Sequence, residues 1–439
     1  MWTFIISILA LTSIREVMAF SILKNARPFG IKHVKNHGRV QYASPPSSPT
    51  YVKSPPSKTR IFVSPLLKSF HTSPERIQNI AINSPKEDRS IAHTPLGSSS
   101  ASHLLNGLDV YEVRAQDDHP LSVYGINSKI NDDDTDESTT KRRPILLLHG
   151  RTWSAVPVYH LLGGENGLED GEKSRSLMEA MYSAGLQPYC MDFRGFGGTP
   201  MDGTKSVIPY QCVQDVESAM EFISSRHVIN CPIDEDEPTT NNLPALLGWS
   251  QGALVAQLAA QKKPEMVSKL ILYGSIYDPM INYPRSPLYR HKQVYDNPDI
   301  EEDNSSKMRD NTFNSAIEDF TVEGSIPPEP AILFAEAALL ADPYKAEWKF
   351  LSQFNTLDPA RVHVPTLVVA GDQDPYAPLR VQADLYTNLA PGVDRTWSII
   401  ADADHAVHLL DGRERFTNIV KSFVENSKQG ESDGCGLLK

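Results

Sequence analysis

The chain has 439 residues, of which 40% are hydrophobic and 22% charged, so it can bury a sizeable globular core. The net charge is −12, but residues 1–86 carry twelve lysines and arginines against two acids, a net +10 that leaves −22 on the remainder. A body this acidic would repel phosphates, which excludes nucleic acid as a partner. The four cysteines are too scattered for a disulfide framework or a C-x-x-C metal site, which indicates unpaired thiols in a reducing compartment.

The first predicted element is a leader. Residues 2–11 form an apolar run about half as long as a membrane span, and Val17-Met18-Ala19 follows with small or medium residues at a signal-peptidase position. We therefore expect a signal peptide at 1–19 and no stable membrane span. Residues 20–104 are largely basic and rich in Ser-Pro pairs, so this segment should be disordered.

A signal peptide followed by Phe20 and a basic, acid-poor segment resembles the bipartite leader of algal proteins whose plastids lie inside extra membranes. The resemblance implies that residues 20–104 are transit-like and that the protein reaches a plastid by the secretory route. Secretion or residence in the endomembrane system is the alternative.

From about residue 105, short apolar runs alternate with helical patterns, which is typical of an α/β sheet. The first two runs lie close together and predict an antiparallel hairpin. The later runs are almost continuously apolar, as expected for parallel strands buried on both faces. The strands are expected at 109–115, 121–126, 145–149, 188–193, 243–248, 270–274, 366–371 and 396–400.

Helices are expected between these strands, where apolar residues recur at spacings of three and four. Two acidic stretches, 127–143 and 230–242, are expected to be solvated loops. The long, aromatic-rich stretch 277–355 separates the sixth and seventh strands. The expected helical segments are 177–184, 213–223, 253–261, 379–389 and 413–424.

The pentapeptide Gly-Trp-Ser-Gln-Gly at 248–252 lies between an expected strand and an expected helix. A serine on such a strand-to-helix turn is held in strained geometry, and the flanking glycines leave room for backbones that nearly touch. Ser250 is therefore predicted to be a nucleophile. The alternative is a serine in an ordinary turn.

Three further motifs follow expected strands in order. They are Asp-Phe-Arg-Gly-Phe-Gly-Gly-Thr from Asp192, Gly-Asp-Gln-Asp-Pro from Gly371, and Asp-His-Ala-Val-His from Asp404. Together with the pentapeptide, they resemble the α/β-hydrolase family over roughly residues 105–427. The resemblance implies an eight-stranded, mostly parallel sheet with flanking helices and a helical cap inserted between strands 6 and 7. The implied parts are a core at 105–276 and 356–427, a cap at 277–355 and a flexible tail at 428–439.

The resemblance also implies a catalytic acid and a base. A serine hydroxyl is a weak nucleophile and needs a base that is oriented by an acid. The family's usual acid is the fourth residue of Gly-x-x-Asp, which is Asp374, with Asp372 and Asp278 as alternatives. The base is expected at His405. The order serine, aspartate, histidine is the order that this fold requires.

Two other histidines compete with His405 as the base. His408 lies three residues further on, and His149 lies in a His-Gly pair at the end of the third strand, where it is expected to hold a loop. Asp404 stands where the family usually has glycine. The first histidine of the Gly-His-x-x-His pattern is the family's base, which selects His405.

The oxyanion that develops on the substrate needs backbone N–H donors. The resemblance implies Gln251, directly after the nucleophile, and Arg151, in the loop after the third strand, with Thr152 as the alternative to Arg151. Asp192 and Arg194 are expected to hold loops near the site. No metal and no cofactor are implied.

These residues predict a serine hydrolase that cleaves a carboxylic ester through an acyl-enzyme, with a small ester or lipid-like molecule as substrate. An acyltransferase using the same residues is one alternative, and the products formed with a competing acceptor would distinguish it. A ligand receptor on a hydrolase fold is another, and it would bind without turnover. Neither the substrate's identity nor the oligomeric state follows from the sequence.

Overall fold

The computed structural model describes residues 101–127, 142–162, 174–227, 243–283 and 309–426. The predicted signal peptide, almost all of the predicted transit-like segment and the predicted tail lie outside these residues. So do most of the two acidic loops, and residues 284–308 of the predicted cap.

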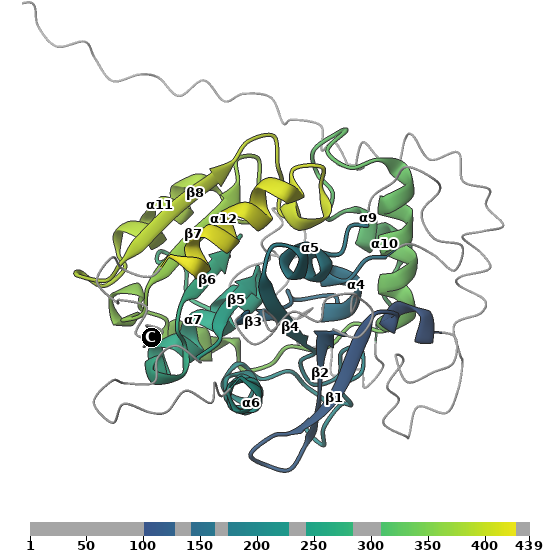
Figure 1. Ribbon diagram of the computed structural model, residues 1–439, viewed down its shortest axis with the longest axis horizontal. Helices are drawn as coiled ribbons and strands as arrows, with labels where there is room; N and C mark the ends of the chain where they lie inside the picture. Colours follow the sequence, from purple (N-terminus) through teal and green to yellow (C-terminus); the bar gives the residue numbers. More distant parts are fainter. Residues whose placement is uncertain (1–100, 128–141, 163–173, 228–242, 284–308, 427–439) are drawn as a thin grey trace, which may run out of the picture. The chain divides into compact units, whose positions relative to one another are not determined.

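The predicted eight-stranded sheet is confirmed, in the order β1-β2-β4-β3-β5-β6-β7-β8 (Figure 1). β1 and β2 form the predicted antiparallel hairpin, β2 also pairs antiparallel with β4, and the other pairs are parallel. The strands are β1 (Leu108–Arg114), β2 (Pro120–Ile126), β3 (Arg143–Leu148), β4 (Leu186–Met191), β5 (Ala245–Trp249), β6 (Leu270–Tyr273), β7 (Thr366–Gly371) and β8 (Arg395–Ile400).

The two faces of the sheet bury alternate residues of the central strands. Leu147, Leu247 and Val369 belong to one hydrophobic cluster, whereas Leu246 and Val368 belong to the other. This alternation explains the continuous apolar runs, because a strand covered on both faces has no polar side. β8 differs because it is an edge strand, and of its residues only Ile400 is buried.

Helices cover both faces. α5 and α12 pack in the first cluster, and α6, α7 and α11 pack in the second; Figure 1 shows α5 and α12 on the opposite side of the sheet from α6 and α7. α6, α7 and α12 contain the segments expected from the apolar spacing, whereas α5 and α11 start where expected and end one and two residues earlier. The five helices are α5 (Leu177–Ser183), α6 (Pro209–Arg226), α7 (Gln251–Lys262), α11 (Leu379–Thr387) and α12 (Arg413–Glu425).

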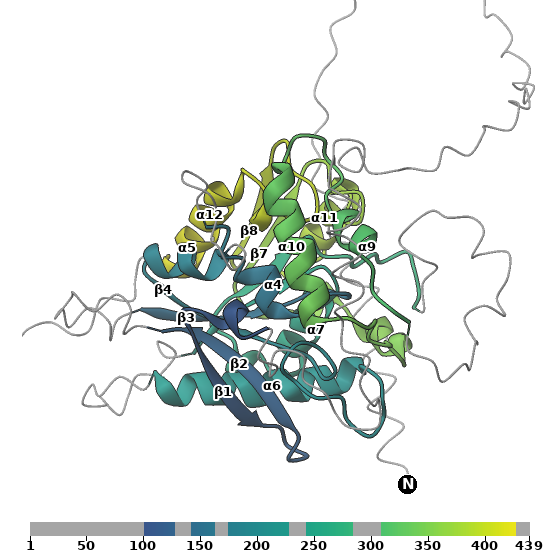
Figure 2. The same cartoon turned by 90° about the vertical axis from the view of Figure 1, so that its right-hand side faces the viewer.

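Two described helices, α9 (Phe313–Ile317) and α10 (Pro328–Ala341), lie between β6 and β7 in the sequence. α10 packs against α9 and against α4 (Ala155–Tyr159), the short helix that follows β3, and Figure 2 shows α10 beside α4. The chain from β6 to β7 therefore contacts the segment that leads out of β3.

Short 3₁₀ turns complete the described chain. The turn η2 (Ser102–Leu105) buries Leu104, a residue just before the expected start of the core at 105. The other turns are η6 (Pro264–Met266), η8 (Leu351–Thr356), η9 (Pro359–Arg361) and η10 (Val407–Leu409). Among the described helices, none is both long enough and apolar enough to cross a membrane.

Candidate active site

Ser250 lies on a sharp turn between β5 and α7. Its φ of 57° and ψ of −119° fall in a region that residues with a side chain rarely adopt, and strain of this kind gathers at functional sites. A Cβ at Gly248 would lie 2.3 Å from the Gly252 carbonyl oxygen, and one at Gly252 would lie 2.3 Å from the His149 carbonyl oxygen. Both positions require glycine because the backbone on either side of the turn leaves no room for a Cβ.

The structure brings His405 and Asp374 together. His405 lies in the loop after β8, and its Nδ1 is 2.8 Å from Asp374 Oδ2 in the loop after β7. The other carboxylate oxygen of Asp374 accepts from the N–H groups of Tyr376 at 2.8 Å and Ala377 at 2.9 Å. Asp374 thus orients the imidazole while its own carboxylate is fixed by the backbone.

The backbone of His405 is fixed as well. Its carbonyl oxygen accepts hydrogen bonds from Trp249 Nε1 at 2.8 Å and from the Tyr273 hydroxyl at 3.0 Å. Trp249 precedes Ser250 directly, and its ring centroid lies 5.2 Å from that of His405. The loop after β8 is therefore tied to the strand that carries the serine.

Burial alone would lower the pKa of His405, but the charge and hydrogen bond of Asp374 outweigh it, helped by the carboxylates of Asp319 and Asp404. The net result is a pKa above the ordinary value for histidine. A general base in this position accepts a proton readily and is stabilised once it carries the charge.

The competing histidines have other partners. His408 is fully buried, its Nδ1 lies 2.9 Å from the Tyr273 hydroxyl, and burial lowers its pKa to about 3. His149 is also fully buried with a pKa of about 3, and its Nε2 accepts from the Phe193 N–H at 3.1 Å. Its Nδ1 therefore carries the proton and donates to the Gly150 carbonyl oxygen at 3.0 Å, which matches the expected loop-holding role.

The competing carboxylates do not contact His405. Asp372 is exposed, and its Oδ1 accepts from the Ala403 N–H at 3.3 Å. Asp278 accepts from the N–H of Met280, two residues further along, at 2.9 Å. Of the three acids considered, Asp374 alone contacts the imidazole of His405.

The two expected oxyanion donors lie on either side of Ser250. Gln251 is the first residue of α7, so its N–H has no acceptor within the helix. A Cβ at Gly150 would lie 3.4 Å from the Cβ of Ser250, which places the loop carrying Arg151 against the serine. Among the described residues, no hydrogen bond joins the Ser250 hydroxyl to His405. Catalytic hydrogen bonds are often long without substrate and tighten when it binds.

The motif after β4 holds loops, as expected. Asp192 accepts from the N–H of Ala155 at 2.7 Å, the N–H of Gly198 at 2.9 Å and the hydroxyl of Tyr124 at 2.7 Å. Arg194 is paired with several carboxylates, including Asp215, which is fully buried. These contacts fix the chain around the loop after β3.

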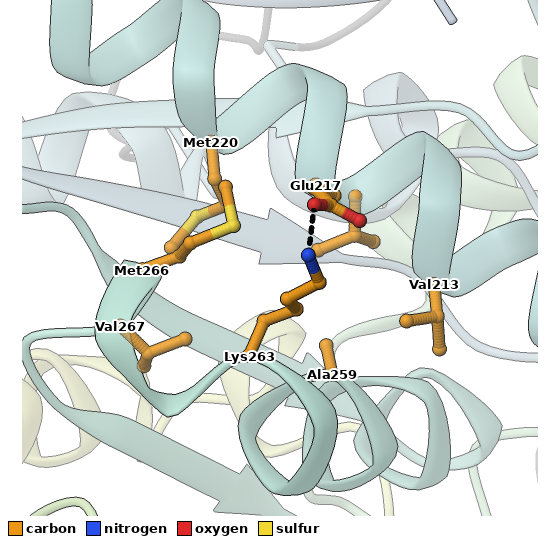
Figure 3. Close-up of a pocket in the computed structure, with 8 residues that line it drawn as sticks. Val213, Glu217, Met220, Ala259, Lys263, Met266 and Val267 are labelled. Carbon is orange, nitrogen blue, oxygen red and sulfur yellow. Dashed lines mark ion pairs between the residues drawn. The ribbon is translucent and has the colours of Figure 1, made fainter. Parts of the chain in front are cut away.

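A small hollow elsewhere in the molecule has different surroundings. It lies between α6, α7 and η6, and Figure 3 shows Lys263 paired with Glu217, with the apolar side chains of Met220 and Val213 on either side. Ala259, in its lining, is nine residues along from Ser250, or about 13 Å at the helical rise. The hollow is therefore at the other end of α7 from the candidate site.

Comparison with protein families matches residues 143–412 to the alpha/beta hydrolase fold, which is more than half of the chain. The chain belongs to the alpha/beta hydrolase fold family. Comparison with curated proteins gives no match.

Solved structures with this fold are similar to this α/β hydrolase at low sequence identity. A thermophilic esterase from Thermogutta terrifontis is 17% identical, covers 72% of this chain and 97% of its own, and has a TM-score of 0.47. A hydrolase from Pseudomonas aeruginosa PA01 is 15% identical, with 73% and 99% covered and a TM-score of 0.46. A meta-cleavage product hydrolase from Pseudomonas fluorescens IP01 is 15% identical, with 71% and 96% covered and a TM-score of 0.45. This likeness concerns the fold and does not extend to a substrate.

Two further acids near His405 in this α/β hydrolase were not expected as part of the site. Asp404, in place of the family's glycine, accepts from the N–H groups of Thr321 at 2.8 Å and Val322 at 3.3 Å. Asp319 accepts from Trp153 Nε1 at 3.0 Å, and burial raises its pKa to about 7. The sequence marks Asp404 only as a departure from the family pattern, and no motif marks Asp319.

Proposed function

We propose that this α/β hydrolase is a serine hydrolase that cleaves a carboxylic ester, with Ser250 as nucleophile, His405 as base and Asp374 as the orienting acid. The observation that carries the proposal is the strained turn at Ser250, whose preceding residue, Trp249, packs against a histidine with its Nδ1 2.8 Å from a buried carboxylate. Ligands of open α/β sheets bind at the carboxyl ends of the strands, and these residues follow β5, β8 and β7.

The proposed reaction begins when the Ser250 hydroxyl attacks the substrate carbonyl. Because Asp374 holds Nδ1 of His405 in the protonated form, Nε2 is free to accept the serine proton. The N–H groups of Gln251 and Arg151 stabilise the tetrahedral oxyanion. Its C–O bond to the alcohol then breaks, His405 returns the proton to the leaving alcohol, and water hydrolyses the acyl-enzyme by the same steps.

A panel of p-nitrophenyl esters of graded acyl length tests this function and measures the size of the acyl pocket. We expect turnover that depends on chain length in the wild-type protein and its loss in His405→Ala. Stoichiometric binding without turnover across the panel would contradict the proposal and favour a receptor. Added alcohols or thiols that capture the acyl group ahead of water would favour an acyltransferase.

The leader supports a proposal about location, which is independent of the chemistry. We propose that residues 1–104 direct the protein to a plastid through the secretory route, because an apolar run is followed by Phe20 and a basic segment. A fluorescent fusion of these residues should reach the plastid and should lose that delivery in Phe20→Ala. Unchanged delivery of the variant would remove the role given to Phe20.

A further inference from the structure

The loop after β3 is held by side chains from the distant chain between β6 and β7. Trp348 Nε1 donates to the Arg151 carbonyl oxygen at 3.1 Å, a contact between residues 197 positions apart. Asp342 Oδ2 accepts from the Ser154 N–H at 2.7 Å, across 188 positions. The loop that lies against Ser250 therefore takes its shape partly from a segment outside the core strands.

Peptide geometry connects these contacts to the oxyanion donors. A trans peptide group is planar, so its C=O and N–H point in opposite directions. The bond from His149 Nδ1 to the Gly150 carbonyl fixes the peptide group that contains the Arg151 N–H. The bond from Trp348 to the Arg151 carbonyl fixes the next peptide group, which contains the Thr152 N–H. Both peptide groups that flank the Arg151 Cα are therefore held through their carbonyl oxygens.

Trp348 is itself firmly supported. Its neighbours pair with Val207, because the Val207 N–H donates to the Glu347 carbonyl at 2.8 Å and the Lys349 N–H donates to the Val207 carbonyl at 3.0 Å. The indole packs edge-on against Phe193 at 5.9 Å, and Phe193 also packs against His149 at 4.6 Å. One phenylalanine thus contacts both rings that hold the loop carbonyls.

We infer that Trp348 is a positioning residue for the oxyanion hole, an inference that rests on the proposed serine-hydrolase function. The indole N–H holds the Arg151 carbonyl, and the loop N–H groups stay directed at the place where the oxyanion forms. An oxyanion donor acts mainly in the transition state, so displacing it lowers kcat and leaves KM nearly unchanged. Displacements of about 1 Å cost roughly 100-fold in rate.

Trp348→Phe in the full chain tests this inference, because phenylalanine keeps an aromatic ring and removes the N–H donor. We expect kcat for a p-nitrophenyl ester to fall about 10- to 100-fold, with KM within roughly 3-fold of wild type. Trp397→Phe is the matched control. Trp397 stacks on Tyr386 at the far edge of the sheet, and its buried Nε1 has no hydrogen-bond partner among the described residues.

A transition-state mimic provides a second readout that lost packing alone would not reproduce. A boronic acid forms a tetrahedral adduct with the serine, so its affinity for Trp348→Phe should fall in parallel with kcat, whereas the affinity for the carboxylic acid product should not. Should Trp348→Phe fail to fold, 3-benzothienylalanine at position 348 keeps the shape of the indole without its N–H. The same losses are expected for that variant.

The inference is overturned if kcat and boronic acid affinity stay at wild-type values in a folded Trp348 variant, or if Trp397→Phe loses as much of both. Either result would leave the serine-hydrolase function intact, because the wild-type protein would still turn over the ester. A failure of the proposed function itself would be seen differently, as absence of turnover in the wild-type protein.

Discussion

Asp374 orients the imidazole ring of His405, and Trp249 and Tyr273 hold the backbone carbonyl of the same residue. Contacts from β5, from β6 and from the loop after β7 therefore converge on one residue, and most of the proposed chemistry depends on it. The sequence marks Ser250, Asp374 and His405 as candidate site residues because each follows a strand within a short motif. Asp319 could not be predicted, because its contact with Trp153 joins residues 166 positions apart without any local pattern.

Replacing Asp374 tests the assignment of the acid. Asp374→Asn keeps the size of the side chain but favours the wrong imidazole tautomer, so we expect kcat to fall by about 10⁴-fold. Asp372→Asn, two residues away, keeps an oxygen that can accept from the Ala403 N–H and should stay close to wild type. Steady-state kinetics on one ester would check both, and an equal loss in the two variants would contradict the assignment.

The charge environment of His405 predicts a pH dependence. The neutral imidazole is the base, so kcat/KM should rise with pH through a His405 pKa that lies above the ordinary value. Asp319→Asn removes one of the carboxylates that raise this pKa, so in this variant the rise of kcat/KM on the acidic side of the pH profile should move to lower pH. Glu318→Gln, which changes the exposed neighbouring acid, is the control. A rise that stays in place in Asp319→Asn would argue against this electrostatic coupling.

The elements differ in how far the sequence predicts them. The central strands were predictable because burial on both faces requires continuous apolar residues. The bounds of α10 within the expected helical cap do not follow from the sequence, because the segment from Pro328 to Ala341 is apolar almost throughout and has no single polar face to mark a helical period. The bonds from Trp348 and Asp342 to the loop after β3 depend on how α10 and the chain after it pack, and no local spacing encodes that packing.

Because the backbones of β5 and α7 nearly touch at Gly248, adding a methyl group there should lower the free energy of unfolding considerably. Gly248→Ala would put a Cβ 2.3 Å from a backbone oxygen, so we expect a loss of about 2–3 kcal/mol in the free energy of unfolding, together with lost activity. Gly203→Ala is the control, because nothing lies within 4 Å of its Cβ position. Denaturant unfolding measures both variants, and equal stability of the two would mean that the turn can relax.

Two buried carboxyls link the stability of the whole molecule to pH. Burial raises the pKa of Asp342 to about 7 and that of Asp192 to about 6, above their unfolded values near 4. Between the unfolded and the folded pKa values, the native state therefore binds more protons than the unfolded chain. The two carboxyls contribute fully to the free energy of unfolding below about pH 4, and this contribution is lost as the pH rises to about 7.

The corresponding variant is Asp342→Asn, which does not titrate. For Asp342 the full change is on the order of 4 kcal/mol, so the free energy of unfolding should depend less on pH between 4 and 7 in the variant than in the wild type. Urea unfolding at several pH values measures this slope. The slope, and not the absolute stability, is the readout, because asparagine also loses an acceptor for the N–H groups of Ser154 and Gly197. An unchanged slope in the variant would contradict the raised pKa of Asp342.

The central claim is that Ser250 is an activated nucleophile, and covalent labelling tests it most directly. A fluorophosphonate probe added to the folded full chain should modify Ser250, as located by peptide mass spectrometry. Labelling should disappear in Ser250→Ala and slow strongly in His405→Ala. Absence of labelling in the folded wild-type protein, or labelling that persists in Ser250→Ala, would contradict the account.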